Sequence, residues 1–558
     1  MKPATGWVKQ PKSAIGLDHL GSQAPCINLY GRLLPGITNV TDRARYYSFY
    51  PWFFWAFEQN YQSIKWEEIV SRYRKADCLF TLIAARHANQ TDQNDENHGI
   101  AMIGRNTLVN ALNKLETEEK PLLLSTYATR ESDTPDRYFK NKLGGLGQYY
   151  IGTFKDLGLL DGNSRSGIKY TKQRAVEIAE TFDSGVDRKL FFDAIDNDKV
   201  STETLDALAS FCPCHLSEAT SEKAILIDLF FDRKNIYGDE GNRRRLTLCM
   251  LLSLIEQLEQ INPQSPDILD HFLFRNAVYS GYLNTETRWA LPEILESIRK
   301  DWAIYQRNEL LSISLQSIFW IALRILSESE TIYPSSEAFI NHLCRSAILE
   351  KALVGQKDIN VLDGIKDLEK RLPAISSCND LNHECFVARD VSKKCSDKNP
   401  DPEYGSLLQR ALNTLLTLAS RSDPGSEPYG PFKFPDNYFN YYPINLHSFQ
   451  SNLSNIWHNL SLKEFVLWLV HRWCLENHLR VALRKMCRDK LDTFRFRPTD
   501  DGLKVVDSIP EPVFTTPRFK QGLKMLWDLG AIEPGPGKGT YKITALGKEL
   551  SDATIGNQ

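Results

Sequence analysis

The feature that most constrains the fold is a pattern that occurs twice, once near residue 155 and once near residue 530. Residues 154–161 read FKDLGLLD and residues 526–533 read LWDLGAIE, and each is an apolar helix end closed by a glycine. A glycine-rich turn between two short strands follows at 161–167 and at 534–539. The second strand ends at Thr171 or Thr544, each of which can cap a last helix. Because the two copies agree at several independent positions, we expect both to fold in the same way.

This order resembles the wing half of a winged helix-turn-helix domain, in which a helix is followed by a two-stranded wing. The resemblance covers only the two short segments and implies two small modules inside a larger fold. Winged helices bind DNA with a helix in the major groove and the wing on the phosphates. Others dock proteins, as in the kleisin-type subunits of chromosome-organising ATPase complexes, so that both roles stay open here.

The chain of 558 residues is too long for one core, and its 42% hydrophobic and 25% charged residues are typical of a folded protein. Apolar residues at three- and four-residue spacing predict helices at 66–115, 223–231, 244–260, 310–327 and 336–354, the first interrupted by a polar loop at 89–98. We therefore expect a mainly α, multidomain helical protein with two small winged-helix (α+β) modules. The expected divisions are an N-terminal leader and helical domain (1–140), a first winged-helix-like module (141–185), a central helical domain (186–375), a Cys-, Pro- and aromatic-rich connector (376–450), and a basic helix with the C-terminal winged-helix module (451–558).

No apolar segment of signal-peptide type opens the sequence. The densest apolar stretch, FYPWFFWAF at 49–57, is too short to span a membrane and contains a proline; it predicts a buried aromatic helix capped by Thr41 or Asp42. Eleven scattered cysteines suit a reducing compartment. These features predict a cytoplasmic protein without a membrane partner. The aromatic, proline-rich tract at 424–443 is expected to pack along a neighbouring domain.

The net charge of −3 means that any nucleic-acid surface must be a local patch. Residues 462–490 predict the longest clear helix, with basic residues at intervals of four, and 493–497 alternate like a strand with two arginines on one face. The predicted nucleic-acid-binding residues are Arg472, Arg480, Arg484, Lys485, Arg488, Arg495, Arg497, Arg518, Lys520, Lys524, Lys538 and Lys542. The alternative is a solvated helix face with a stabilising Glu476–Arg480 pair.

No complete catalytic motif is present. Arg472 and His478 fit the loose spacing of HEPN ribonucleases, which they resemble, but Trp473 stands where those enzymes usually have a polar residue. The triplet Asp228, Asp232 and Lys234 is similar to a nuclease metal site, although this segment is predicted to be helical. Residues 535–540 resemble a P-loop only superficially and are interpreted as a wing turn. No catalytic residue is therefore assigned.

Two groups of residues could supply zinc ligands. Cys212, Cys214 and His215 are adjacent donors whose spacing is wrong for a zinc finger. The second group, Cys378, His383, Cys385 and Cys395, lies in a polar stretch and is the better candidate. Because free buried cysteines are the commoner explanation, we predict neither a metal nor another cofactor, and the question stays open for the second group.

Taken together, the sequence predicts a non-enzymatic DNA-binding or scaffolding subunit of a bacterial multi-protein complex. The expected partners are double-stranded DNA and other protein subunits, such as an ATPase or a nuclease. In its length and general organisation, though not in any motif, the chain resembles large subunits of bacterial anti-phage defence systems, which accompany a nuclease or an SMC-like ATPase. The alternatives are a nuclease effector with a divergent active site and a structural adaptor whose modules face only protein.

Overall fold

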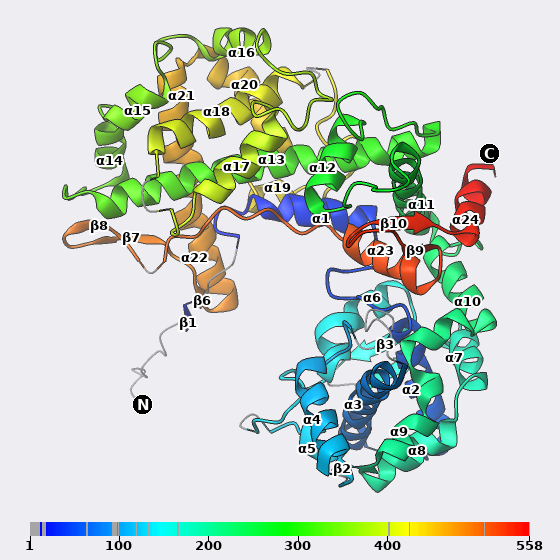
Figure 1. The fold of residues 1–558 in the computed structure, drawn as a ribbon. Coiled ribbons are helices and arrows are strands. Elements are labelled where there is room, and N and C mark those ends of the chain that lie inside the picture. Colours follow the sequence, from blue (N-terminus) through cyan, green and yellow to red (C-terminus); the bar gives the residue numbers. More distant parts are fainter. Residues whose placement is uncertain are drawn as a thin grey trace, which may run out of the picture. The chain divides into compact units, whose positions relative to one another are not determined.

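The computed structural model describes residues 12–13, 18–62, 65–91, 98, 100–118, 120–131, 134–163, 167–399, 402–422, 425–506 and 508–556. Within these ranges the protein is mainly α-helical, and its strands form only two-stranded sheets (Figure 1). The predicted mainly α class is therefore confirmed. Parts of the leader (1–11 and 14–17), of the polar loop (92–97) and of the first glycine-rich turn (164–166) lie outside the described residues.

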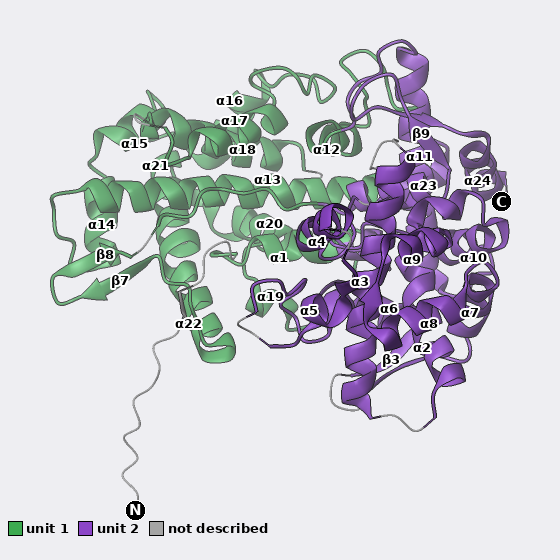
Figure 2. Ribbon diagram, turned by 60° about the horizontal axis from the view of Figure 1, so that its bottom comes forward, with its two compact units in different colours: residues 1–30, 270–290, 299–516 green, residues 31–269, 291–298, 517–558 purple. Residues whose placement is uncertain are grey.

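The chain divides into two compact units, each built from segments that are distant in the sequence (Figure 2). Unit 1 comprises residues 1–30, 270–290 and 299–516, and unit 2 comprises residues 31–269, 291–298 and 517–558. Both copies of the repeated pattern belong to unit 2, whereas the basic helix belongs to unit 1. The predicted nucleic-acid-binding residues are therefore divided between the units, with those at 472–497 in unit 1 and those at 518–542 in unit 2.

Unit 2 is built mainly from short and medium helices. They are α2 (Tyr46–Asn60), α3 (Trp66–Thr91), α4 (Arg105–Glu118), α5 (Leu124–Ala128), α6 (Ile151–Asp156), α7 (Ala175–Ser184), α8 (Arg188–Asn197), α9 (Thr202–Ala207), α10 (Thr220–Phe231), α11 (Gly238–Ile261), α23 (Phe519–Asp528) and α24 (Ala545–Gly556). Its strands are β2 (Leu122–Leu123), β5 (Lys199–Val200), β3 (Leu160–Asn163), β4 (Gly167–Tyr170), β9 (Ile532–Pro534) and β10 (Tyr541–Ile543), which pair antiparallel as β2–β5, β3–β4 and β9–β10.

The aromatic helix α2 forms the centre of this unit's core. Phe49 stacks on Phe80 of α3 with ring centroids 4.1 Å apart, and Trp52 Nε1 donates to Asp183 of α7. The helix begins after Arg45, so the predicted cap at Thr41 or Asp42 is wrong. Arg45 makes no cap either, because its buried guanidinium pairs with Glu222 at 3.1 Å.

The two copies of the repeated pattern share a hydrogen-bond pattern as well as a sequence pattern. In each copy a helix (α6 or α23) leads through a glycine with positive φ, Gly158 at 63° or Gly530 at 74°, into an antiparallel hairpin and a last helix (α7 or α24). The hydroxyl of Thr171 donates to Gly158 O at 2.5 Å, and that of Thr544 donates to Gly530 O at 2.7 Å. The neighbouring backbone bonds also match: Leu159 N to Phe154 O (2.7 Å) and Ala531 N to Leu526 O (2.8 Å), then Thr171 N to Leu159 O (3.0 Å) and Thr544 N to Ala531 O (3.1 Å).

The copies differ at the start of their last helix and in what covers them. Thr544 caps α24 as predicted, since its hydroxyl accepts from Gly547 N at 3.2 Å. Thr171 does not cap α7, which begins after Arg174. In the first copy α7 packs on α2, and in the second copy α11 packs on α23, α24 and β10. Each hairpin therefore depends on a helix from a distant part of the sequence.

Unit 1 contains the longest helix. Its elements are α1 (Gln23–Leu33), α12 (His271–Ser280), α13 (Glu293–Glu328), α14 (Ser336–Leu343), α15 (Ala347–Ala352), α16 (Val361–Glu369), α17 (Glu384–Lys394), α18 (Tyr404–Ser420), α19 (Tyr438–Tyr441), α20 (Leu446–Asn455), α21 (Leu462–Trp468) and α22 (Asn477–Asp489), with β1 (Lys12–Ser13) parallel to β6 (Leu491–Asp492) and β7 (Phe496–Thr499) antiparallel to β8 (Gly502–Val505). The first residues of α13 and the last of α1 are counted with unit 2.

The helix predicted at 462–490 is present, but it is neither uniform nor the longest. A π-helical stretch, Leu469–Glu476, joins α21 to α22, and α13 has 36 residues. The predicted helix at 336–354 is likewise divided, into α14 and α15. Among the described residues α13 alone has the length and apolar composition of a membrane span, and most of its apolar window is buried inside the protein.

The aromatic tract at 424–443 is partly buried against α13. Tyr429 is 1% exposed, and its hydroxyl donates to Asn308 at 2.9 Å. The rings of Phe434 and Phe439 lie 5.0 and 5.1 Å from that of Tyr429. Packing of these side chains explains how a proline-rich segment, whose one described helix is the short α19, is held in place.

Candidate functional site

The three arginines of α22 form an incomplete stripe. Arg480 and Arg488 are exposed. Arg484 is half-buried, since its guanidinium donates to the carbonyl oxygen of Tyr441 and lies 5.2 Å from the ring centroid of Tyr442. Arg480 is therefore available to a phosphate group, Arg488 lies 3.7 Å from the carboxylate of Asp489, and Arg484 is held on an aromatic surface.

Two other predicted residues of this helical region already have partners. Arg472 is exposed and bonds Glu476 at 2.7 and 2.8 Å, so that Glu476 pairs with Arg472 and not with Arg480 as predicted. Lys485 Nζ donates to the carbonyl oxygen of Asp18, and burial lowers the pKa of its ammonium group. Lys485 thus anchors the start of α1 and presents little charge to solvent.

The two arginines predicted to share one strand face lie in different environments. Arg495 precedes β7 and is 1% exposed, so phosphate groups cannot reach it. Arg497 lies in β7, pairs with Asp492 and stacks on Phe494 at 5.3 Å. The predicted alternation fails here because the strand begins only at Phe496, so that Arg495 lies outside it.

In unit 2 the predicted cations are also divided. Arg518 lies 3.5 and 3.4 Å from the carbonyl oxygens of Gly31 and Leu34, and Lys524 pairs with Asp42 at 3.1 Å. Among the described residues, the other three predicted cations of this unit have no ion-pair partner: Lys520, Lys538 and the half-buried Lys542. The C-terminal module therefore offers few free charges.

The helix before the second hairpin is mostly buried. Phe519, Leu523 and Leu526 of α23 are at most 2% exposed, and Asp528 is buried against Arg43 at 3.1 Å. Of its ten residues only Lys520 is fully exposed. A helix that reads DNA must present several side chains to base edges, and α23 does not do so in unit 2 as described.

The hairpin of this second copy borders a different kind of surface. A hollow of about 740 Å³ is lined by its turn, by Trp527 and Tyr541, and by Leu523 of α23, with Lys538 and Lys524 among the charged lining groups. Aromatic and apolar side chains at such a hollow are typical of a protein-docking surface.

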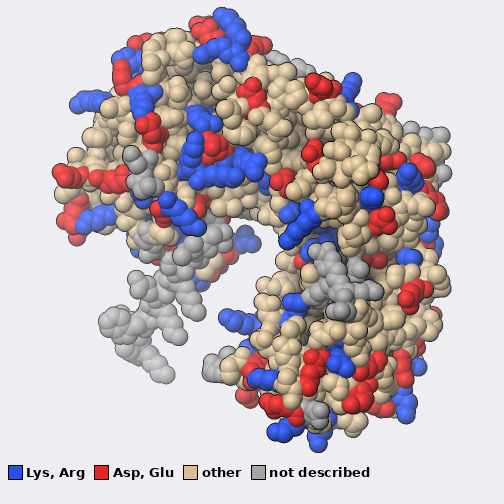
Figure 3. All heavy atoms as spheres, viewed as in Figure 1, with Lys and Arg blue, Asp and Glu red and all other residues tan. Residues whose placement is uncertain are grey.

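Unit 1 carries a basic surface that the sequence analysis did not single out (Figure 3). It follows α17 and α18, and we call it the Lys393 surface: Arg275, Arg389, Lys393, Lys394, Lys398 and Arg410. These six side chains line two hollows of about 280 and 550 Å³, and Lys393 lines both. Asp390 pairs with Lys394 and Arg410 at 2.9 and 2.7 Å, whereas Lys393 and Lys398 have no ion-pair partner among the described residues.

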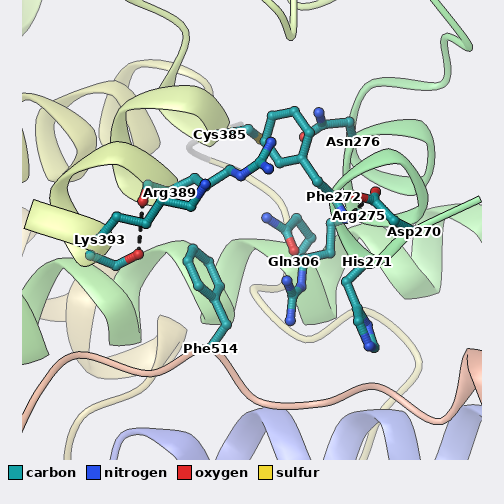
Figure 4. A pocket seen from close by; sticks show the side chains of 11 residues that line it. Asp270, His271, Phe272, Arg275, Asn276, Gln306, Cys385, Arg389, Lys393 and Phe514 are labelled. Atoms are coloured by element: carbon teal, nitrogen blue, oxygen red, sulfur yellow. Dashed lines mark hydrogen bonds between the residues drawn. The ribbon is translucent and has the colours of Figure 1, made fainter. Parts of the chain in front are cut away.

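The smaller hollow combines cations with aromatic rings (Figure 4). Arg389 of α17 lies 4.2 Å from the ring centroid of Phe272, and Arg275 of α12 lies 4.7 Å from that of Phe514. Buried Gln306 lines it too, and its side-chain oxygen has no hydrogen-bond partner among the described residues. Cations beside aromatic faces are the arrangement that suits phosphates and bases together.

Part of this surface could have been found in the sequence. Lys393, Lys394 and Lys398 lie within six residues, in the segment expected to be a connector. Arg275 and Arg410 are distant in sequence, and only the packing of α12, α17 and α18 brings them to the same place.

The residues considered for nuclease chemistry do not form a site. His478 is fully buried, accepts from Arg495 N at 2.9 Å and lies 3.1 Å from the carbonyl oxygen of His19, while Arg472 points to solvent. Asp232 is 1% exposed and accepts from the backbone amides that follow it. Asp228 bonds Arg233 and Lys234, so each of these groups has a structural role.

The better of the two candidate zinc groups does not assemble in the described residues. His383 Nδ1 accepts from Cys385 N at 3.2 Å, and its Nε2 lies 3.2 Å from the carbonyl oxygen of Ile375, so both ring nitrogens are used. Cys378 Sγ is 3.9 Å from His383, but no three ligand atoms gather around them in the described part of the chain. Cys395 is buried at the opposite end of α17 from Cys385, directly after the last residue of the helix.

No protein-family model, curated protein or solved structure matches this chain. Inferences about its function therefore rest on its own residues.

Proposed function

We propose that this protein is a non-enzymatic, DNA-binding subunit of a larger assembly, and that the Lys393 surface of unit 1 contacts the DNA backbone. The observation that carries the proposal is the gathering of six cationic side chains around two adjoining hollows, in a protein whose net charge is −3. Phosphate binding requires such local clustering. The exposed arginines of α22 are a second basic set in the same unit.

We also infer that the two helix–hairpin–helix segments are winged-helix-like modules. Their matched hydrogen bonds indicate that the two segments share one local fold, and their order of elements is that of a wing and its flanking helices. The helix α23 is mostly buried, Arg518 donates to the carbonyl oxygen of Leu34, and Lys524 pairs with Asp42. These contacts favour packing or protein docking over DNA reading for the C-terminal copy. The hollow beside its hairpin suits a protein partner, in keeping with the scaffolding role. Membership of a bacterial defence complex rests on overall resemblance and stays a prediction.

The test is salt-dependent binding of the full chain to a fluorescent DNA duplex. Lysines 393, 394 and 398 are changed together to Gln, and the control changes Lys357, Lys366 and Lys370, which are exposed lysines of the same unit. Both variants lose three charges. We expect the first to bind about a hundredfold more weakly at 0.1 M salt and to lower the salt slope by about 3, and the control to bind like the unchanged protein.

Two results would contradict the proposal: no measurable affinity for duplex at low salt, or equal losses in the two triple variants. A third variant, with Arg480, Arg484 and Arg488 changed to Gln, measures the share of α22. If only that variant loses affinity, the contact lies on α22 and the assignment to the Lys393 surface is wrong.

A further inference from the structure

Four metal-ligating side chains meet in unit 2, and none of them is among the residues used above for DNA binding. His87 lies near the end of α3, His98 is the last residue of the polar segment 89–98, and Cys212 and Cys214 lie on either side of Pro213 between α9 and α10. One ligand atom from each lies within 4.8 Å of all the others. It is the one such group of three or more among the described residues.

We propose that His87, His98, Cys212 and Cys214 bind one zinc ion that ties these three segments of unit 2 together. Two cysteines and two histidines are a usual ligand set of structural zinc sites. With Zn–S near 2.3 Å and Zn–N near 2.0 Å, a tetrahedral site places neighbouring sulfur and nitrogen atoms about 3.5 Å apart. His87 Nδ1 is 3.3 Å from Cys214 Sγ, and His98 Nδ1 is 3.4 Å from Cys212 Sγ.

The hydrogen bonds around the group prepare the ligands for a metal. Thr91 Oγ1 donates to the carbonyl oxygen of His87 at 2.9 Å, so it accepts from His98 Nε2 at 3.4 Å. The proton of His98 is thereby placed on Nε2, and Nδ1, which faces Cys212, carries the lone pair. Such outer contacts fix the tautomer and the ring orientation of metal-binding histidines.

The segment that carries Cys212 and Cys214 is also fixed by hydrogen bonds from Arg45. Arg45 donates to the carbonyl oxygens of Ser210 and Cys212, and its guanidinium is fixed by the buried pair with Glu222. Cys212 is fully buried and Cys214 is half-buried. Two thiolates and two neutral imidazoles balance the charge of Zn²⁺, so the complete centre is neutral and can be buried without another counter-charge.

The geometry favours a structural zinc over a catalytic one. Four protein ligands fill a tetrahedron and leave no position for water or substrate. A neighbouring cavity of about 450 Å³, lined by His87, His98 and Cys214, gives the ion a path from solvent. His215 lines the same cavity, but its ring stacks on that of His87 and it pairs with Glu218, so it is not one of the ligands.

The experiment measures metal in the full-length protein, purified under reducing conditions without a metal-affinity step. Elemental analysis should give about one zinc ion per chain. After removal of zinc, Co²⁺ should produce the strong visible bands of a tetrahedral site and the near-ultraviolet absorption of thiolate–cobalt bonds. The variant Cys212→Ser/Cys214→Ser should lose the zinc and these bands.

Matched variants separate this site from its alternatives. Cys249→Ser changes another buried cysteine of unit 2, whose sulfur lies 3.3 Å from Thr554, and it should keep the zinc. His215→Ala and Cys378→Ser should keep it too, whereas His98→Ala should weaken zinc binding at least tenfold. Metal removal should lower the thermal midpoint of the unchanged protein and leave that of the cysteine double variant unaffected.

The proposal is overturned if the unchanged protein neither contains zinc nor gives the cobalt spectrum, a result that does not depend on any variant's folding. It is also overturned if Cys212→Ser/Cys214→Ser retains the zinc, or if Cys378→Ser loses it. None of these outcomes depends on DNA binding, so the site and the proposed function can fail separately.

Discussion

We predict that the buried imidazole of His478 makes unit 1 sensitive to acid. His478 lies between α13 and β7, where its ring contacts those of Phe319 and Phe496 at 4.9 and 5.7 Å. Burial, together with the nearby cations Arg495 and Lys485, lowers the pKa of His478 from 6.5 to about 4. Because the Nε2 atom accepts from the Arg495 amide, protonation would also break a hydrogen bond.

The sign and size of the effect follow from the two pKa values. In the unfolded chain His478 binds a proton near pH 6.5, whereas in the folded protein it does so only near pH 4. The stability that the neutral ring contributes is complete above pH 6.5 and is lost as the pH falls toward 4. Between pH 7.5 and pH 5 the loss from this group is about 2 kcal/mol, because each pKa unit corresponds to about 1.4 kcal/mol.

The assay is urea unfolding of the full chain, followed by tryptophan fluorescence at pH 7.5 and at pH 5. The perturbation is His478→Gln, which removes the titration and keeps an acceptor for the Arg495 amide. This variant should be less stable at pH 7.5, but its loss of stability on acidification should be about 2 kcal/mol smaller than that of the unchanged protein. His342→Gln changes an exposed histidine of the same unit and should keep the full pH dependence.

His19 contributes to the same acid sensitivity. Burial lowers its pKa to about 3, with a further contribution from His478, whose ring is 5.9 Å away. His478→Gln therefore removes about half of the combined effect, and the double variant with His19→Gln should remove most of the rest. An unchanged pH dependence in His478→Gln would refute the reasoning, and would show that this imidazole titrates normally, as a catalytic histidine could.

The remaining predictions concern unit 2. Asp528→Ala should lower the free energy of unfolding by about 3–5 kcal/mol because it leaves the Arg43 guanidinium buried without its carboxylate, while Arg43→Met/Asp528→Leu should recover most of that loss in a double-mutant cycle. Recovery of less than about 1 kcal/mol would contradict the importance of the unpaired charge. Gly530→Ala should cost about 1 kcal/mol through its positive φ alone, since open space surrounds the added methyl group. Gly158→Ala should cost more in the same denaturation assay, because its methyl group would also meet Arg174 at 3.1 Å; equal costs would argue against the equivalence of backbone strain in the two copies.

Local patterns in the sequence determined the repeated segments well. The positive φ at Gly158 and Gly530, the hairpins and the helices around them all depend on residues close together in the chain. Helix periodicity likewise determined the mainly α class, because an amphipathic stripe reports one buried face whatever it packs against. The limits of such patterns appear at helix starts. Thr171 and Thr41 have side chains suited to capping, yet each is used in a different contact.

Which cations remain free, and which ligands meet, was decided only by tertiary structure. Arg495 and Arg480 are equally basic in the sequence, but the first is buried and the second is exposed, since burial depends on the packing of distant segments. The Lys393 surface needs α12 beside α17, and the proposed zinc ligands need His87 and His98 beside Cys212 and Cys214. The spacing of Cys212 and Cys214 alone argued against a metal because half of the ligands come from more than a hundred residues upstream.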